Sequence, residues 1–278
     1  MRNIMNISDQ LSYSTIRIEC KTTAGYFSTG TGFFFNFCHE NNTCCPAIVT
    51  NKHVIKDATE CNLIFTLADS SGNPIDGKHW IVNVIGLQSA WKLHPDPDID
   101  LCVMPIANII NHLRTTGFRP FYIGLDISLI PSEKQKAELQ SIEDIIMVGY
   151  PDGIWDTINN KPIFRKGITA THPNRDYNGK KEFLIDAACF NGSSGSPVFI
   201  YNEIGYLTGN TFNLGQKRLL FMGMLRAGHL HSIKGDICIE DQALKPVSLS
   251  YIPNNLGIVI KSENLLYFEE MFRKELNH

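Results

Sequence analysis

The sequence predicts an all-β protein made of two β units and a C-terminal helix. Two groups of short runs rich in β-branched and aromatic residues are separated by a stretch of helical character, and an apolar stripe at helical spacing lies near the end. A chain of 278 residues can bury one large core or two modest ones. With 43% apolar and 19% charged residues, its composition is that of an ordinary globular protein.

The first group of predicted strands lies in the N-terminal part of the chain. Each strand is a short β-branched or aromatic run that ends at Gly, Asn, Asp or Pro. These strands are Ser14–Cys20, Gly32–Phe37, Ala47–Thr50, Cys61–Ala68, Trp80–Leu87 and Leu101–Ile106. Their spacing is typical of a barrel or a sandwich.

Residues 107–142 have helical character and connect the two groups. A capping box formed by Ser132 and Gln135 predicts the start of one helix. The strands then resume at Ile145–Gly149, Gly167–Thr171, Phe183–Ala187, Pro197–Tyr201, Leu219–Leu225 and Gly257–Lys261. Beyond them, Ser262–Leu276 carries the apolar stripe of an amphipathic helix, with Ser262 as its N-cap.

Charge and composition exclude several classes of function. The 25 Lys and Arg against 28 Asp and Glu give a net charge of −3, and no basic cluster is present, so we expect no nucleic-acid partner. No run of 18 apolar residues and no signal peptide is visible, so we expect no membrane partner and a cytoplasmic location. There the eight cysteines would be reduced thiols. Because their spacing fits no zinc site, we expect neither a metal nor another cofactor.

A candidate nucleophile lies in a loop rich in Gly and Ser. Gly192 and Gly195 flank Ser194, which allows a tight turn whose backbone N–H groups point at one spot, as an oxyanion hole requires. The same string would also suit a plain loop between two strands. A partner base is therefore needed before Ser194 is given a catalytic role.

Candidates for the base and for its orienting carboxylate lie in the first group of strands. His53 follows directly after the strand that ends at Thr50, although a lone histidine is usually structural. Asp96, Asp98 and Asp100 all lie just before a strand, where a carboxylate could orient the imidazole. Each of these elements is weak alone.

Together, in the order His, Asp, Ser, these elements resemble the chymotrypsin-like serine peptidases over most of the chain. The Asp186-Ala187-Ala188 string resembles the bacterial HtrA/Deg peptidases, and the segments 195–199 and 258–264 resemble the staphylococcal glutamyl endopeptidases. The strings that carry the wider resemblance are Gly30-Thr31-Gly32-Phe33, Thr50-Asn51-Lys52-His53-Val54, Asp100-Leu101-Cys102-Val103 and Gly192-Ser193-Ser194-Gly195-Ser196-Pro197.

This resemblance implies two six-stranded antiparallel β-barrels and a C-terminal α-helix. The N-terminal barrel would comprise residues 12–115 and carry His53 and Asp100. The second barrel would comprise residues 116–262 and carry Ser194, and the helix would comprise residues 263–278.

The resemblance also assigns the catalytic roles. Ser194 would be the nucleophile, His53 the general base, and Asp100 the carboxylate that holds the imidazole tautomer. Asp100 is preferred to Asp98, because choosing Asp98 would place Asp100 in the apolar register of the following strand. The backbone N–H groups of Gly192 and Ser194 would form the oxyanion hole.

The implied substrate pocket favours a small or apolar P1 residue. Ala188 brings no carboxylate to the base of the pocket, and a glutamyl enzyme would have His in place of Leu225. Arg226 leaves two alternatives open, since it would recruit an acidic P1 residue if it pointed inward and be a surface cation if it pointed outward. The pocket residues implied by the resemblance are Ala188, Cys189, Phe190, Asn191, Leu225, Arg226 and Ala227.

Two hypotheses about function follow. The first is a serine endopeptidase that acts on protein or peptide substrates, with its activity restricted by pocket shape or by a regulatory protein partner. The second is a catalytically silent or latent binding module on the same fold, which needs a partner or a trigger. A lipase-type α/β-hydrolase is disfavoured, because the Gly-x-Ser-x-Gly pattern fails at Ser196 and the order of the partners is wrong.

Overall fold

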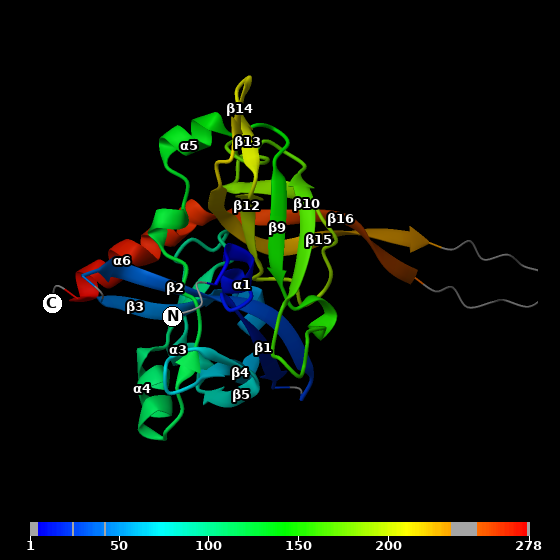
Figure 1. Ribbon diagram of the computed structural model, residues 1–278. Coiled ribbons are helices and arrows are strands. Elements are labelled where there is room, and N and C mark those ends of the chain that lie inside the picture. Colours follow the sequence, from blue (N-terminus) through cyan, green and yellow to red (C-terminus); the bar gives the residue numbers. More distant parts are fainter. Residues whose placement is uncertain (1–4, 24, 42, 235–248, 277–278) are drawn as a thin grey trace, which may run out of the picture.

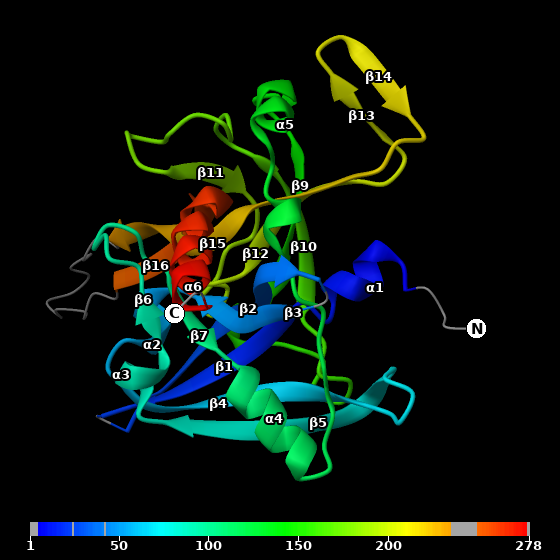
Figure 2. The same cartoon turned by 90° about the vertical axis from the view of Figure 1, so that its left-hand side faces the viewer.

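The computed structural model describes residues 5–23, 25–41, 43–234 and 249–276. Its main strands form an open sheet and a closed barrel, which a partly helical segment connects. In Figure 1 the blue and cyan strands of the first unit occupy the lower part, and the green to orange strands of the barrel occupy the upper part. Figure 2 shows the same two layers from the side.

The N-terminal unit is one antiparallel sheet in which neighbouring strands follow the order β5-β4-β1-β2-β3-β7-β6, with β8 beside β4. Because side chains alternate along a strand, Phe33, Phe35 and Phe37 lie in one apolar core and Phe34 lies in another. The elements are α1 (Ile7–Leu11), β1 (Thr15–Thr22), β2 (Phe27–Glu40), β3 (Thr43–Thr50), α2 (Lys52–Ile55), β4 (Ala58–Ala68), β5 (Pro74–Ile85), α3 (Leu87–Ala90), β6 (Lys92–Leu93), β7 (Cys102–Pro105) and β8 (Pro120–Phe121).

This sheet differs from the closed six-stranded barrel that the resemblance implies. It has eight strands, and its end strands β5 and β6 do not pair with each other. Strand β6 has only two residues and β7 only four, the last of which is Pro105, so this edge offers few backbone groups for a closing ladder. The expectation of a closed first barrel is therefore corrected to an open sheet.

The C-terminal unit is a closed six-stranded barrel in the order β10-β11-β16-β15-β12-β9, as the fold prediction requires. Inward-facing apolar residues such as Ile145, Phe183, Val198 and Val259 fill it. The elements of this unit are β9 (Asp144–Gly149), the 3₁₀ turn η2 (Pro151–Gly153), β10 (Ile163–Thr169), β11 (Glu182–Asp186), β12 (Pro197–Asn202), β13 (Gly205–Thr208), β14 (Thr211–Leu214), β15 (Arg218–Lys234) and β16 (Leu249–Lys261).

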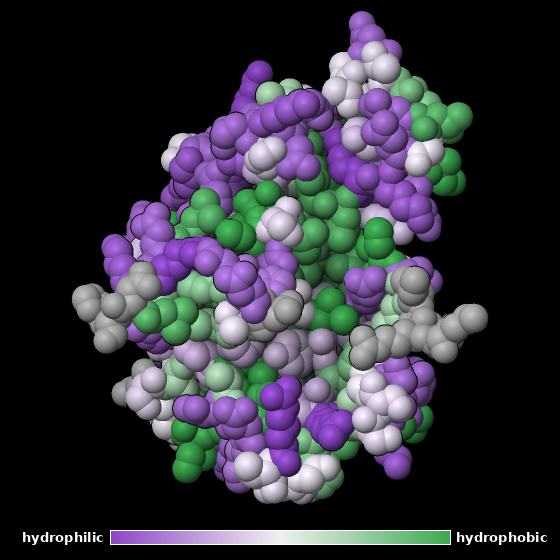
Figure 3. Space-filling model, turned by 60° about the vertical axis from the view of Figure 1, so that its left-hand side comes forward, coloured by the Kyte–Doolittle hydropathy of each residue, from purple (hydrophilic) through white to green (hydrophobic). Residues whose placement is uncertain are grey.

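The hairpin formed by β13 and β14 was not predicted. It forms a separate two-stranded sheet and projects from the barrel (Figures 1 and 2). The side chains of Ile204, Phe212 and Leu214 are more than half exposed there. Figure 3 shows this apolar surface on the projecting hairpin.

Helices connect the two units and end the chain. The connection contains α4 (Ala107–Thr115), the 3₁₀ turn η1 (Ile127–Leu129) and α5 (Glu133–Glu138), and the predicted capping box of Ser132 and Gln135 is present. The C-terminal segment begins as the 3₁₀ turn η3 (Ser262–Leu265) and continues as α6 (Leu266–Leu276), so Ser262 lies inside the turn instead of capping an α-helix. The rings of Phe268 and Phe272 lie near Phe37, so α6 packs against the first unit.

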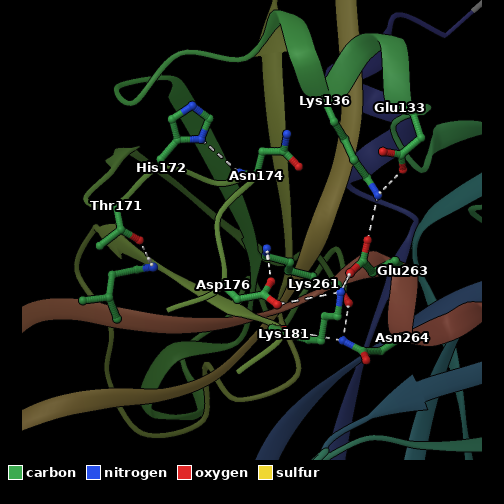
Figure 4. A network of polar contacts seen from close by, with 11 residues as sticks. Glu133, Lys136, Thr171, His172, Asn174, Asp176, Lys181, Lys261, Glu263 and Asn264 are labelled. Atoms are coloured by element: carbon green, nitrogen blue, oxygen red, sulfur yellow. Dashed lines mark hydrogen bonds and ion pairs between the residues drawn. The ribbon is translucent and has the colours of Figure 1, made fainter. Parts of the chain in front are cut away.

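A network of ion pairs holds the connection against the barrel (Figure 4). Lys136 of α5 lies 2.7 Å from Glu263 of η3, and Lys181 lies 3.0 Å from the same carboxylate. Nearby, the ammonium group of Lys261 lies 2.6 Å from Asp176. These contacts join α5, the loop before β11 and the start of the terminal helix.

No helix in the described ranges is long and apolar enough to cross a bilayer. The seven cysteines in these ranges form no disulfide, and Cys238 lies outside them. Two of the seven, Cys20 and Cys61, are buried and face each other in the register of β1 and β4.

Candidate active site

His53 lies on the short helix α2, directly after β3. Its Nδ1 atom lies 2.6 Å from Oδ2 of Asp100, and its backbone N–H donates to Oδ1 of the same carboxylate at 3.1 Å. The His53 side chain is 45% exposed, whereas that of Asp100 is 19% exposed. The carboxylate therefore orients an imidazole that remains accessible from solvent.

A neighbouring side chain of the same unit holds the backbone at Asp100. The side-chain amide of Asn51 donates to the carbonyl oxygen of Asp100 at 2.8 Å. Burial raises the pKa of the Asp100 carboxyl, but the hydrogen bonds and charge of His53, together with the charge of Arg226, outweigh it and lower that pKa. Asp98 is exposed, and its N–H donates to Asp96 in the preceding turn. The structure thus brings Asp100, and not Asp98, against His53.

Ser194 lies in a tight turn just before β12, and two glycines with positive φ shape this turn. Gly192 has φ +79°, and a Cβ atom there would lie 2.6 Å from the carbonyl oxygen of Tyr150. Gly195 has φ +88°, and a Cβ atom there would overlap the carbonyl oxygen of Thr31. Both positions therefore require glycine.

Thr31 of β2 holds the Ser194 turn from the other unit. Its N–H donates to the carbonyl of Ser194 at 2.9 Å, and its hydroxyl donates to the carbonyl of Gly192 at 3.0 Å. The same hydroxyl accepts the N–H of Tyr150 at 3.0 Å, and Thr50 donates to the Thr31 carbonyl at 2.7 Å. Sequence reasoning gave Thr31 no role, although a polar residue between two glycines in an apolar strand was a usable signal.

The backbone N–H groups of Gly192 and Ser194 are unengaged. Neither donates to an acceptor among the residues that the structure describes. The carbonyl of Asn191 points away from them, since it accepts the N–H of Asp152 at 2.5 Å. The two donors can therefore bind an oxygen atom of a ligand.

The hydroxyl of Ser194 donates to the backbone carbonyl of Arg226 at 3.2 Å. Within the described ranges, no hydrogen bond joins it to His53. A rotation about the Cα–Cβ bond of Ser194 is therefore needed before the imidazole can take its proton.

The predicted pocket residues divide into two groups. Cys189 and Leu225 are buried in the core of the barrel, and the backbone of Leu225 pairs with Gly195 and Ser196. The other predicted residues are partly or fully accessible: Ala188, Phe190, Asn191, Arg226 and Ala227. Sequence reasoning did not single out Arg165 of β10, whose guanidinium lies 4.8 Å from the centre of the Phe190 ring.

Arg226 turns toward a buried carboxylate. Its Nε atom lies 3.0 Å from Oε1 of Glu182 in β11, and the side chains are 31% and 8% exposed. Arg226 also lines a cleft of about 1070 Å³ together with His53 and Asp100. Sequence reasoning did not predict this cleft or its further lining residues, which include Ile55, Leu87, Trp91, Leu93 and Lys180.

These groups are suited to acyl transfer. An imidazole oriented by a carboxylate can accept and return a proton, a hydroxyl can attack a carbonyl carbon, and paired amides can bind the resulting oxyanion. The described residues contain no group of three His, Cys, Asp or Glu side chains placed to hold a metal ion.

A closed barrel and an open β unit with Ser, His and Asp at their junction define a chymotrypsin-like protein. Residues 30–209 match the family model of the trypsin-like peptidase domain, and the chain belongs to this family. Members of the family are serine proteases, whose substrates are peptides or proteins. No curated protein matches the chain.

A solved structure of an HtrA-type protease shares the fold. The HtrA-type protease AlgW, solved with a tripeptide, has a TM-score of 0.51 and 13% identity over 94% of this chain. A serine endoprotease from Yersinia pestis has a TM-score of 0.49 and 15% identity, with coverage of 98% of this chain and 68% of its own. Deg5 has a TM-score of 0.45 and 17% identity, with coverage of 79% and 81%. The chain spans 60% of the length of AlgW, and at this identity the likeness shows the fold alone.

Proposed function

We propose that the protein is a serine endopeptidase that works through an acyl-enzyme, with Ser194, His53 and Asp100 as its triad. The observation that carries this proposal is the 2.6 Å contact between His53 and Asp100, in a cleft that is also lined by Arg226, whose carbonyl accepts the Ser194 hydroxyl. Membership of the trypsin-like peptidase family supports it.

In this mechanism a peptide carbonyl places its oxygen against the N–H groups of Gly192 and Ser194. Ser194 turns from the Arg226 carbonyl, and its oxygen attacks the carbonyl carbon while His53 takes its proton. The C–N bond then breaks as His53 returns that proton to the leaving amine. A water molecule, deprotonated by His53, hydrolyses the acyl-enzyme and frees Ser194. Asp100 stabilises the protonated imidazole in both halves.

A small or apolar P1 residue fits the residues before the nucleophile. Ala188 supplies no carboxylate that would pair with a basic P1 side chain. Arg226 is paired with Glu182 at 3.0 Å, which leaves it poorly placed to recruit an acidic P1 residue. Both observations support the apolar preference.

A latent or silent binding module is the second candidate. It is favoured by the hydrogen bond from Ser194 to the Arg226 carbonyl, which leaves the nucleophile without its base. In such a protein a partner or trigger would have to release Ser194, or a peptide would bind without being cut.

Labelling with a fluorophosphonate tests the proposal and separates the two candidates. We expect the probe to modify Ser194 at neutral pH, as located by mass spectrometry, and we expect His53→Ala to lose this labelling while remaining folded. The Ser194→Ala variant should show no modification and less than about 10⁻³ of the wild-type peptide hydrolysis. Folded wild-type protein that does not react would contradict an assembled site and favour the binding module.

The assignment of the carboxylate has its own test. Asp100→Asn should lower kcat by about 10⁴, the scale of the same change in a Ser-His-Asp triad, because an amide favours the wrong imidazole tautomer. Asp98→Asn, an identical change in the exposed turn, should leave kcat within about twofold. A large loss at Asp98 with little change at Asp100 would reverse the assignment.

A further inference from the structure

Arg226 contacts the nucleophile and faces the His53–Asp100 pair at once. Its backbone carbonyl accepts the Ser194 hydroxyl at 3.2 Å. Its side chain lines the cleft beside His53 and Asp100, which belong to the other unit. One residue of β15 therefore contacts the nucleophile and shares a cleft with the acid–base pair.

Glu182 is the charged partner of the Arg226 guanidinium. The carboxylate belongs to barrel strand β11, is 8% exposed, and lies 3.0 Å from the Nε atom of Arg226. Backbone bonds from Tyr177 to the Glu182 carbonyl and from Glu182 to the Lys180 carbonyl hold that residue. A half-buried cation with a buried counter-ion is screened less by solvent than a surface cation is.

We propose that Arg226 is a positioning residue whose charge keeps Asp100 ionised beside His53. This inference rests on the proposed triad. Its physical basis is the positive charge of the guanidinium, which disfavours protonation of the His53–Asp100 pair. The lowered pKa of the Asp100 carboxyl, to which the Arg226 charge contributes, is consistent with this role.

Other charged groups face the same pair. Lys52 donates to the backbone carbonyl of Asp96 at 2.8 Å, and Lys180 is exposed at the rim. Among the residues whose side chains the structure describes, the charged groups that line this cleft besides Arg226 are Lys52, Lys56, Asp57, Asp98 and Lys180. Lys180 is the matched control, because it lines the same cleft from the same unit but is exposed.

The test is the rate of fluorophosphonate labelling of Ser194 as a function of pH. In Arg226→Gln the His53–Asp100 pair should take up a proton more readily. The acidic limb of the pH–rate profile should therefore move to higher pH by about half a unit, and the labelling rate at pH values below the limb should fall about threefold. Arg226→Lys keeps the positive charge, so the acidic limb should lie at its wild-type position. Lys180→Gln should leave it in place, and Glu182→Gln should not move it to higher pH, because the cation stays.

Two results would overturn the inference: a uniform loss of rate at every pH in Arg226→Gln, or equal shifts in Arg226→Gln and Lys180→Gln. If Arg226→Gln does not fold, the uncharged variant Arg226→Met takes its place in the same comparison. If the wild-type protein is not labelled at any pH, the proposed peptidase activity fails. An NMR titration of the His53 imidazole signal then tests Arg226 alone, since an unchanged midpoint in Arg226→Gln contradicts the positioning role.

Discussion

At Gly195 the main chain passes so close to the Thr31 carbonyl that no larger side chain fits. The same threonine holds the carbonyls of Gly192 and Ser194 through its hydroxyl and its N–H group. These bonds hold the 192–193 and 194–195 peptide groups, which flank the peptide that carries the Ser194 N–H, so a residue that touches no reacting atom fixes the turn around that amide. The shape of the candidate oxyanion hole thus depends on Thr31, a residue of the first unit.

Gly195→Ala should abolish labelling of Ser194 and lower the stability of the fold. The added methyl group meets the Thr31 carbonyl in a buried site, and φ +88° is unfavourable for alanine by about 1–2 kcal/mol in addition. Gly215→Ala is the matched control, because Gly215 has φ +77° with open space around it and loses only that second contribution. Denaturant unfolding and labelling of both variants provide the comparison, and equal effects would contradict the role assigned to Thr31.

Sequence reasoning could nominate candidate reacting groups for the site but not their setting. The alternating pattern after Asp100 separates it from Asp98, because moving the register by two residues would place a carboxylate in an apolar strand. The partnership of Arg226 with Glu182 depends on how two barrel strands meet, so no local pattern reveals it. Cys189 and Leu225 were predicted to line the substrate pocket, but both are buried in the barrel core.

At the scale of elements, the segment that connects the two units is held in place by charged contacts as well as by apolar packing. Burial raises the pKa of the Glu263 carboxyl, but the hydrogen bonds and charges of Lys136 and Lys181 outweigh it and lower that pKa. One carboxylate therefore holds two lysines from different segments (Figure 4). This contact keeps α5 near the start of the terminal helix.

Glu263→Gln should lower the free energy of unfolding by about 1 kcal/mol at neutral pH, mainly because the largely buried ammonium group of Lys136 loses a partner, while the exposed ammonium group of Lys181 adds little. The matched control is Glu203→Gln, since Glu203 forms an exposed pair with Lys217 at 3.8 Å and should cost less than about 0.5 kcal/mol. Urea unfolding measures both. Equal losses would show that the network adds nothing beyond a surface ion pair.

The elements with strong sequence patterns were predicted well, and those that depend on tertiary contacts were not. The capping box gives the start of α5 because it is a local interaction. The β13–β14 hairpin was missed because its strands have only four residues each and it pairs with no strand of the barrel. The first unit stays an open sheet because β6 and β7 are too short to close it, which a count of predicted strands does not show.

For the whole molecule, the ionisable groups define a range of pH in which the fold is most stable. Carboxyl groups such as Asp100, Asp126 and Glu263 have lowered pKa values in the folded state. Their contribution is present above the ordinary carboxyl pKa of about 4 and is lost as pH falls through the folded values. Burial raises the pKa of the Cys20 thiol to about 11 and that of Cys61 to about 12. These thiols stay neutral in the fold but ionise in the unfolded chain above pH about 8.5, which favours unfolding there.

We therefore expect the midpoint of unfolding in guanidinium chloride to be highest between about pH 5 and pH 8 and lower at both pH 3 and pH 10. Cys61→Ala should reduce the alkaline loss and leave the acidic loss unchanged, because it removes the thiol with the higher pKa. Denaturant titrations of the wild-type protein and this variant at the three pH values measure the effect. A midpoint at pH 10 equal to that at pH 7 would contradict it.

The contact of Thr31 with the Ser194 turn also bears on the order in which the protein becomes active during synthesis. Thr31 is made before any strand of the barrel, whereas β16, which closes the barrel between β11 and β15, is made after the other five. A nascent chain without β16 has an open barrel, and its Ser194 turn lacks the support that the closed barrel provides. We therefore expect a growing polypeptide to have no working nucleophile, which would protect both it and its neighbours on the same messenger RNA from premature cleavage.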